Sequence, residues 1–196
     1  MGMQETIETI GRAKALIDAG MCRVGPGLVP TERGDALLAG GAGRALALAD
    51  CVTRLCRHDH PGEALVLLRQ LAETAVLLRW LRPAQEGGAR RVEEAVSEGR
   101  EPEWDGLWSS DRFRARAREA GVREEEVESI LRLCADFARG GSTGAPWSHV
   151  FAENHHRPVE AERVLRLAAR MMGHVLKALD TRWPGSFPAG DASWEG

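Results

Sequence analysis

The stretch that decides the fold covers residues 61–82 and reads PGEALVLLRQLAETAVLLRWLR. Apolar side chains lie on nearly every side of a helix built from it, which is typical of a helix at the centre of a bundle. Arg69 and Glu73 interrupt this pattern at mid-length, and residues four apart share one face of a helix. A charge inside protein needs a partner. These two residues are therefore the first candidates for a functional site.

The rest of the chain also shows helical spacing of its apolar residues. Such stretches cover residues 7–17, 37–55, 127–137 and 164–179. We therefore predict an all-α fold, a single helical bundle of about six or seven helices. The 196 residues, 43% of them hydrophobic, are enough for one well-buried domain. We expect this domain to cover residues 1–183, with a polar excursion at 84–108 and a flexible C-terminal tail at 184–196.

Glycines and charges add local expectations. The first helix is expected to end near Gly20, and the glycine cluster at residues 40–43 predicts close helix packing, or a bend or break in the second helix. Glu124 to Glu126 fall in the first turn of a helix, where carboxylates favour the exposed amides. Arginines at every second position from 112 to 118 scatter around a helix, which favours a solvated face over an RNA-binding stripe.

Composition narrows the class of protein. The balance of 26 basic and 29 acidic residues excludes a globally cationic nucleic-acid binder and leaves a local patch open. All basic residues except Lys14 and Lys177 are arginine, which fits a bacterial genome rich in G and C. Four cysteines without C-x-x-C spacing predict reduced thiols. No secretion signal is recognisable, and charges within residues 64–81 favour burial in protein over lipid, so we expect a cytoplasmic protein without membrane contact.

Three of the six histidines lie in the stretch 145–158, which reads APWSHVFAENHHRP. His149, His155 and their neighbour His156 have the chemistry of general acids or bases, metal ligands or phosphate donors. They are equally suited to capping the last helix or bonding the central Arg69 and Glu73. No E-x-x-H signature joins them to a metal, so we expect none and no cofactor. A bound metal would draw on Glu73, His155 and His174.

The combination of a central helix carrying R-x-x-x-E with a later histidine-bearing loop at 148–156 resembles a family of bacterial all-helical proteins, similar in turn to the HEPN-like superfamily. The resemblance covers roughly residues 31–180. HEPN ribonucleases of toxin and antiphage systems carry an R-x4-6-H motif, and the segment RLCRHDH, from Arg54 to His60, fits it. This motif lies early in the chain and Pro61 follows at once, whereas the family motif lies near the start of a late helix.

The resemblance implies a metal-independent ribonuclease, or an accessory component of a defence or toxin system. Arg54 or Arg57 would then steady a scissile phosphate while His60 or His155 moves protons, and a homodimer would complete the site. A plainer alternative is that Arg54, Arg57 and His58 only favour the C-terminal end of their helix electrostatically.

Two other classes stay open on sequence alone. The first is a small-molecule-binding or metal-dependent enzyme, with a pocket between Arg69, Glu73 and the loop at 149–156. The second is a non-catalytic dimeric interaction protein in which the charged pair only sets helix register. The partners expected are a second copy of the chain and either RNA or a small anionic ligand.

Overall fold

α3 (Pro61–Trp80) is the helix around which the others pack. The computed structural model describes residues 2–28, 33–81, 109–138 and 160–188. These ranges contain six α-helices and no strand, so the all-α helical bundle is confirmed. The remaining helices are α1 (Met3–Val24), α2 (Arg33–Arg57), α5 (Ser110–Glu119), α6 (Glu124–Ala138) and α7 (Ala161–Arg182), with a 3-10 turn, Gly25–Gly27, after α1.

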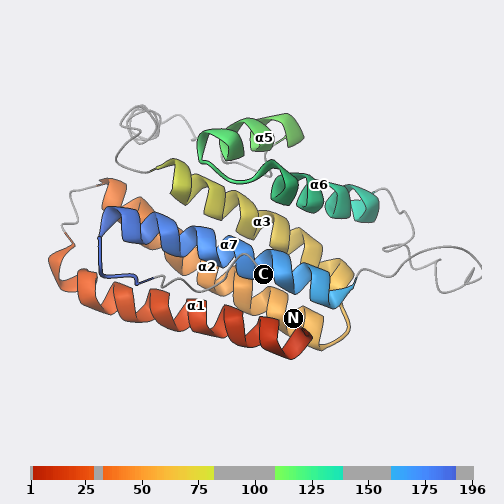
Figure 1. Cartoon of the computed structure of the whole chain (residues 1–196), viewed down its shortest axis with the longest axis horizontal. Coiled ribbons are helices and arrows are strands. Elements are labelled where there is room, and N and C mark those ends of the chain that lie inside the picture. Colours follow the sequence, from red (N-terminus) through yellow and green to blue (C-terminus); the bar gives the residue numbers. More distant parts are fainter. Residues whose placement is uncertain (1, 29–32, 82–108, 139–159, 189–196) are drawn as a thin grey trace, which may run out of the picture.

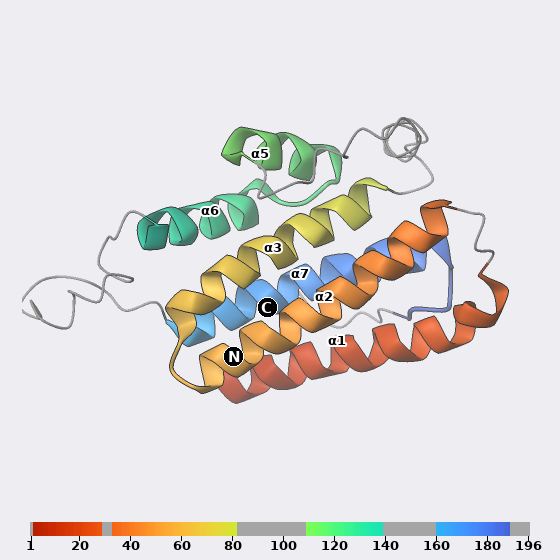
Figure 2. The same ribbon diagram turned by 180° about the vertical axis from the view of Figure 1, so that it is seen from behind.

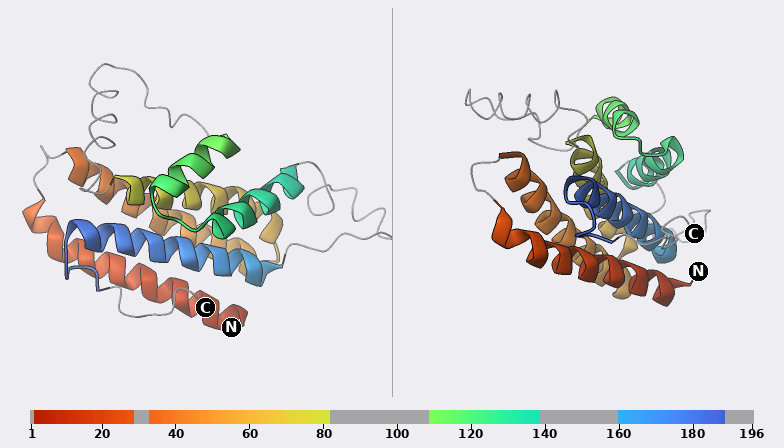
Figure 3. Two further views of the ribbon diagram at one scale, coloured as in Figure 1. Left: turned by 45° about the horizontal axis from the view of Figure 1, so that its top comes forward. Right: turned by 60° about the vertical axis from the view of Figure 1, so that its left-hand side comes forward.

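Two units make up the described fold (Figure 1). α1, α2, α3 and α7 form a bundle of long helices, and α5 and α6 form a short hairpin on the opposite side of α3 from α1 (Figure 2). Views from other directions show the hairpin lying over α3 and α7 (Figure 3). α3 therefore contacts helices on both sides, which explains why its sequence is apolar almost all round.

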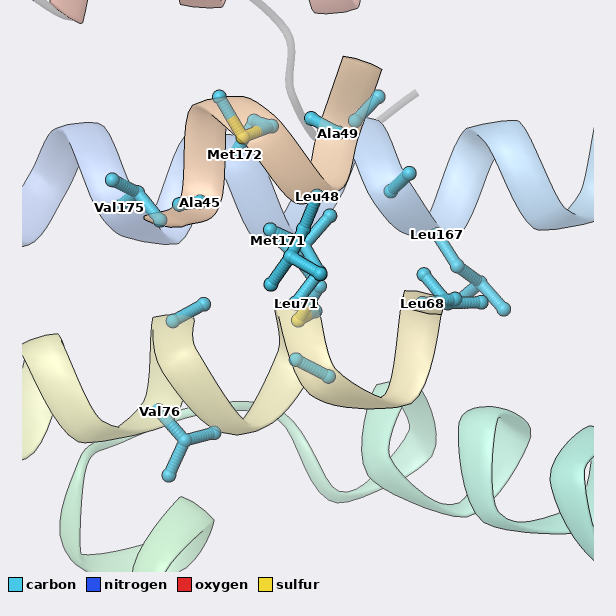
Figure 4. Close-up of a cluster of buried hydrophobic side chains, with 14 of the residues drawn as sticks. Ala45, Leu48, Ala49, Leu68, Leu71, Val76, Leu167, Met171, Met172 and Val175 are labelled. Atoms are coloured by element: carbon cyan, nitrogen blue, oxygen red, sulfur yellow. The ribbon is translucent and has the colours of Figure 1, made fainter. Parts of the chain in front are cut away.

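The bundle core forms where α2, α3 and α7 meet (Figure 4). Leu71 of α3 and Met171 of α7 are almost completely buried there, and Leu48 of α2 is 9% exposed. Val76, one turn further along α3, is also buried, but its side chain points toward the hairpin. The same helix thus supplies apolar contacts to both units, and each buried side chain of this size contributes roughly 1.5–3 kcal/mol.

Glycines act as contact points rather than as helix breaks. α2 continues through residues 40–43, and a Cβ built on Gly41 would lie 2.5 Å from Cδ2 of Leu78, so close packing is confirmed and a division of the helix is not found. The expected end of the first helix near Gly20 is wrong. α1 continues to Val24. Gly20 is instead the place where the Phe187 ring packs, and two ring carbons lie 2.3 Å from the position of a Cβ added to Gly20.

The chain after α7 begins with a packed segment. The sequence predicts a flexible tail from residue 184 in which Phe187 and Trp194 can contact the bundle. Phe187 is completely buried, and Arg23 donates two hydrogen bonds to the Ser186 carbonyl oxygen, at 3.2 and 2.6 Å. The segment 184–188 is therefore packed against α1. The polar excursion predicted at 84–108 and the rest of the tail lie outside the described residues.

One described helix has the length and composition of a membrane span. It is α2 from Gly34 to Arg57, with a mean hydropathy of 1.3 and 33% of the apolar window buried. The core helix of a soluble protein passes the same test. In the bundle α2 packs against α3, α7 and α1.

Candidate functional site

Arg69 and Glu73 form the buried ion pair that the sequence predicts. Nε of Arg69 lies 2.7 Å from Oε1 of Glu73, and the two side chains are 7% and 12% exposed. The Phe113 ring of α5 covers the guanidinium, whose carbon lies 4.2 Å from the ring centroid. A cation over an aromatic face in a desolvated place gains about 2 kcal/mol. The pair is thus enclosed by apolar groups at the junction of α3 with the hairpin.

A thiol lies beside this pair. Sγ of Cys134, on α6, lies 3.6 Å from the Leu65 carbonyl oxygen. Burial raises the pKa of Cys134 to about 11, the positive charge of Arg69 lowers it slightly, and the negative charge of Glu73 raises it. A thiol with so high a pKa is almost entirely protonated at neutral pH and is a poor nucleophile.

The sequence predicts four cysteines that are reduced and buried. All four are free, but Cys22 and Cys51 are exposed, so the expected burial is wrong for these two.

The histidine-bearing loop lies outside the described residues, and so do His149, His155 and any approach of His155 to Glu73. Of the three metal ligands proposed, Glu73 pairs with Arg69, whereas His174 pairs with Glu126. Glu73 and His174 thus belong to different clusters. Within the described ranges no group of three or more His, Cys, Asp or Glu side chains could hold a metal ion.

Arg54 and His60 lie where α2 turns into α3. Arg54 is 77% exposed, and its Nε lies 2.7 Å from Asp50, which also binds Lys14 of α1 at 2.6 Å. His60 is 60% exposed and stands just before α3, with Nδ1 4.0 Å from Glu63. Both side chains are accessible from solvent, and both have a carboxylate nearby. Their role in RNA cleavage stays a prediction.

A second polar cluster, which the sequence did not indicate, lies where α3, α6 and α7 meet. It surrounds a cavity of about 100 Å³. We call this cavity the basic pocket; its lining consists of Arg79, Gly121, Arg123, Glu126, Arg170, Gly173, His174 and Lys177. Four of these side chains are basic and one, Glu126, is acidic.

Among the described residues that line the basic pocket, Glu126 is the one carboxylate. It is only 3% exposed; Oε1 lies 2.7 Å from a guanidinium nitrogen of Arg123, and Oε2 lies 2.8 Å from Nε2 of His174. Burial by itself raises the pKa of Glu126, but the hydrogen bonds and positive charges of His174 and Arg123 outweigh burial and hold the pKa at about 2. Glu126 is therefore ionised at neutral pH, and because a carboxylate can only accept, His174 donates from Nε2.

The other ring nitrogen of His174 has a different environment. Nδ1 is buried, and it has no hydrogen-bond partner within the described part of the chain. An unsatisfied buried polar atom costs roughly 1–3 kcal/mol. Such atoms are rare in folded proteins and mark places where a water, an ion or a ligand completes the bonding.

The turn between α5 and α6 forms one wall of the basic pocket. Nε of Arg79 donates to the Ala120 carbonyl oxygen at 3.2 Å, and a second guanidinium nitrogen reaches the Gly121 carbonyl at 3.5 Å. Gly121 has φ +67°, a conformation that glycine adopts without strain. The guanidinium of Arg79 thus links α3 to the turn of the hairpin.

A larger cavity of about 180 Å³ lies on the hairpin itself, between Arg114, Arg118 and Glu124. Its charges are closer to balance, and Arg114 is already bound to Glu128 and to Asp111. The basic pocket differs because its described lining contains four basic side chains and because its charged residues come from α3, α6, α7 and the turn before α6. It is the better candidate for a binding site.

Sequence reasoning missed this site for a physical reason. Glu126 and His174 are 48 positions apart, and the sequence offered only helix-end electrostatics for the first and a conditional metal role for the second. Spacing of residues along one helix gives no information about which turn of another helix it meets. A comparison with models of protein families found no match, and no similar protein was found among curated proteins or solved structures.

Proposed function

We propose that this protein binds a small anionic ligand in the basic pocket between α3, α6 and α7. The observation that carries the proposal is the convergence of Arg79, Arg123, Arg170 and Lys177 on one cavity, whose described lining contains one carboxylate. Arginine and lysine donate the charge-assisted hydrogen bonds that bind carboxylates and phosphates.

The position of the pocket also supports binding. It opens at the boundary between the long bundle and the hairpin, and ligand sites commonly lie at such boundaries between packed units. The buried charges of Arg69 and Glu73 already neutralise each other. The basic pocket, where basic side chains line an open cavity, is the more favourable place for an anion.

Isothermal titration calorimetry of the full chain with sodium sulfate at low ionic strength tests the proposal. The decisive variant is Lys177→Gln, because Lys177 is exposed on α7 and the substitution leaves the core intact. Its matched control is Arg163→Gln, which removes an exposed charge from the same helix about 21 Å away by helical rise. We expect saturable binding, weakened about tenfold by Lys177→Gln and unchanged by Arg163→Gln. Equal binding by both variants would contradict the proposal.

A further inference from the structure

We propose that the ligand of the basic pocket is a short carboxylate with a hydrogen-bond donor on the neighbouring carbon, and that this donor binds Nδ1 of His174. The donor is a hydroxyl or an ammonium group. This inference rests on the proposed function, since it needs an anionic group in the basic pocket. It adds what the ligand must carry besides its charge.

The contact with Glu126 fixes where His174 carries its proton. Nε2 of His174 lies 2.8 Å from Oε2 of Glu126, a carboxylate that is only 3% exposed and also binds Arg123. This carboxylate is ionised at neutral pH and can only accept, so Nε2 carries the N–H. A neutral imidazole has one N–H, and Nδ1 of His174 is therefore an unprotonated acceptor.

This acceptor is buried and meets no donor from the described part of the chain. His174 itself belongs to the lining of the basic pocket. A buried acceptor without a donor costs free energy in the unliganded protein, and a donor that reaches it removes that cost. The new bond replaces no bond to bulk water, so it adds more to affinity than the same bond at an exposed site.

The basic side chains keep their present partners when they hold the carboxylate. Arg79 donates to the carbonyl oxygens of Ala120 and Gly121, and Arg123 donates to Glu126. A guanidinium has five N–H donors and an ammonium has three, so one side chain can serve a protein partner and an anion together. The pocket therefore holds the anionic group without losing the contacts that shape it.

Size sets how far apart the two groups of the ligand can be. His174 and the four basic side chains line one cavity of about 100 Å³. This volume is well below the roughly 300–1,000 Å³ of pockets that enclose a drug-sized molecule. The pocket thus takes a ligand of few heavy atoms, and a donor on the carbon next to the carboxylate meets that limit.

Two small acids isolate the contribution of the donor. Glycolate and propionate have the same charge and nearly the same shape, but glycolate has a hydroxyl where propionate has a methyl group. A site with a buried acceptor rejects the analogue that lacks the donor, because the acceptor then stays unpaired. Selection between these acids therefore depends on Nδ1 of His174 and not on charge.

Calorimetry of the full chain with sodium glycolate, glycine and sodium propionate at pH 7.5 tests the inference. We expect glycolate or glycine to bind about tenfold more tightly than propionate. The preference should disappear in His174→Gln, whose amide nitrogen can still donate to Glu126 but which has no acceptor at the ring position of Nδ1. The matched control is Arg163→Gln on the same helix, which should keep the preference.

Nitrogen NMR of the native chain gives a second readout that needs no folded variant. We expect the ring of His174 to carry its proton on Nε2 and to show an unprotonated Nδ1. Binding of glycolate or glycine should shift the Nδ1 signal toward that of a hydrogen-bonded nitrogen, and propionate should not.

The outcomes separate this inference from the proposed function. Equal binding of the three acids, or a protonated Nδ1 in the native chain, would overturn the donor inference and leave anion binding intact. A preference that persists in folded His174→Gln would overturn it as well. Failure of sulfate and of all three acids to bind would overturn the proposed function itself. Between glycolate and glycine, the tighter ligand identifies the donor as hydroxyl or ammonium.

Discussion

Two polar clusters lie along α3 and differ in their surroundings. Arg69 is neutralised by Glu73 within a single helix and covered by an aromatic ring. Arg79, ten residues and about 15 Å further along α3, belongs to a cluster in which four basic side chains and one described carboxylate line a cavity. The first cluster is closed over by the Phe113 ring, whereas the second borders open space. Charge that converges on a cavity is therefore a better indicator of a binding site than burial of charge.

The largest effect is expected from breaking the complete pair. Glu73→Gln keeps the shape of the side chain but leaves the buried guanidinium of Arg69 without its counter-charge, which should destabilise the fold by about 3–5 kcal/mol. Urea denaturation measures this loss. The matched control is Glu63→Gln on the same helix, where the side chain is 64% exposed and the change should stay within about 0.5 kcal/mol. Similar stability of the two variants would show that the pair is already accessible to water.

The second-largest effect on stability is expected when acid protonates Glu126 in the basic pocket. The folded pKa of Glu126 is about 2 against an ordinary value of 4.5, so its ionisation contributes about 3 kcal/mol to stability at neutral pH. Because the folded pKa is depressed, this contribution is present above pH 4.5 and is lost as the pH falls from 4.5 to 2. Comparing the unfolding free energies of the native chain and Glu126→Gln over this range measures it. A difference independent of pH would contradict the assignment.

Thiol labelling compares solvent access directly. The pKa of Cys134 is about 11, and burial raises that of Cys56 to about 11 as well. At pH 8 their thiolate fractions are roughly 100-fold below that of a cysteine with the ordinary pKa of 9.0. Iodoacetamide followed by mass spectrometry should therefore modify the exposed Cys22 and Cys51 at least about 100-fold faster. Rapid labelling of Cys134 would mean that the cluster around Arg69 opens to solvent.

The smallest effect on stability is expected at the rim of the basic pocket. Lys177→Gln should change the unfolding free energy by less than about 0.5 kcal/mol, because the side chain is exposed. It should still weaken anion binding. Lys177→Gln would therefore lower the affinity for the anion without lowering stability, whereas Glu73→Gln lowers stability. A large loss of stability in Lys177→Gln would show that this lysine is part of the scaffold.

The helices and the Arg69–Glu73 pair could be predicted because their information is local. The 3.6-residue repeat marks the buried faces, and residues four apart must meet on one helix. The basic pocket depends instead on how three helices are placed, and on a turn that requires Gly121 with positive φ. Gly20 shows the same limit: the sequence treated it as a helix end, while its actual role is set by Phe187, 167 positions later.

That last contact has a consequence for synthesis of the chain. The apolar face of α1 is covered largely by α7, and Phe187 then fills the space beside Gly20. The 136 residues from Gly25 to Glu160 separate the two helices, so at translation rates of about 5–20 residues per second α1 waits roughly 7–27 s for its partner. During that interval side chains such as Ile10 and Ile17 have no α7 to cover them. α1 is thus covered only after α7 has been made, and its apolar face is exposed to aggregation until then.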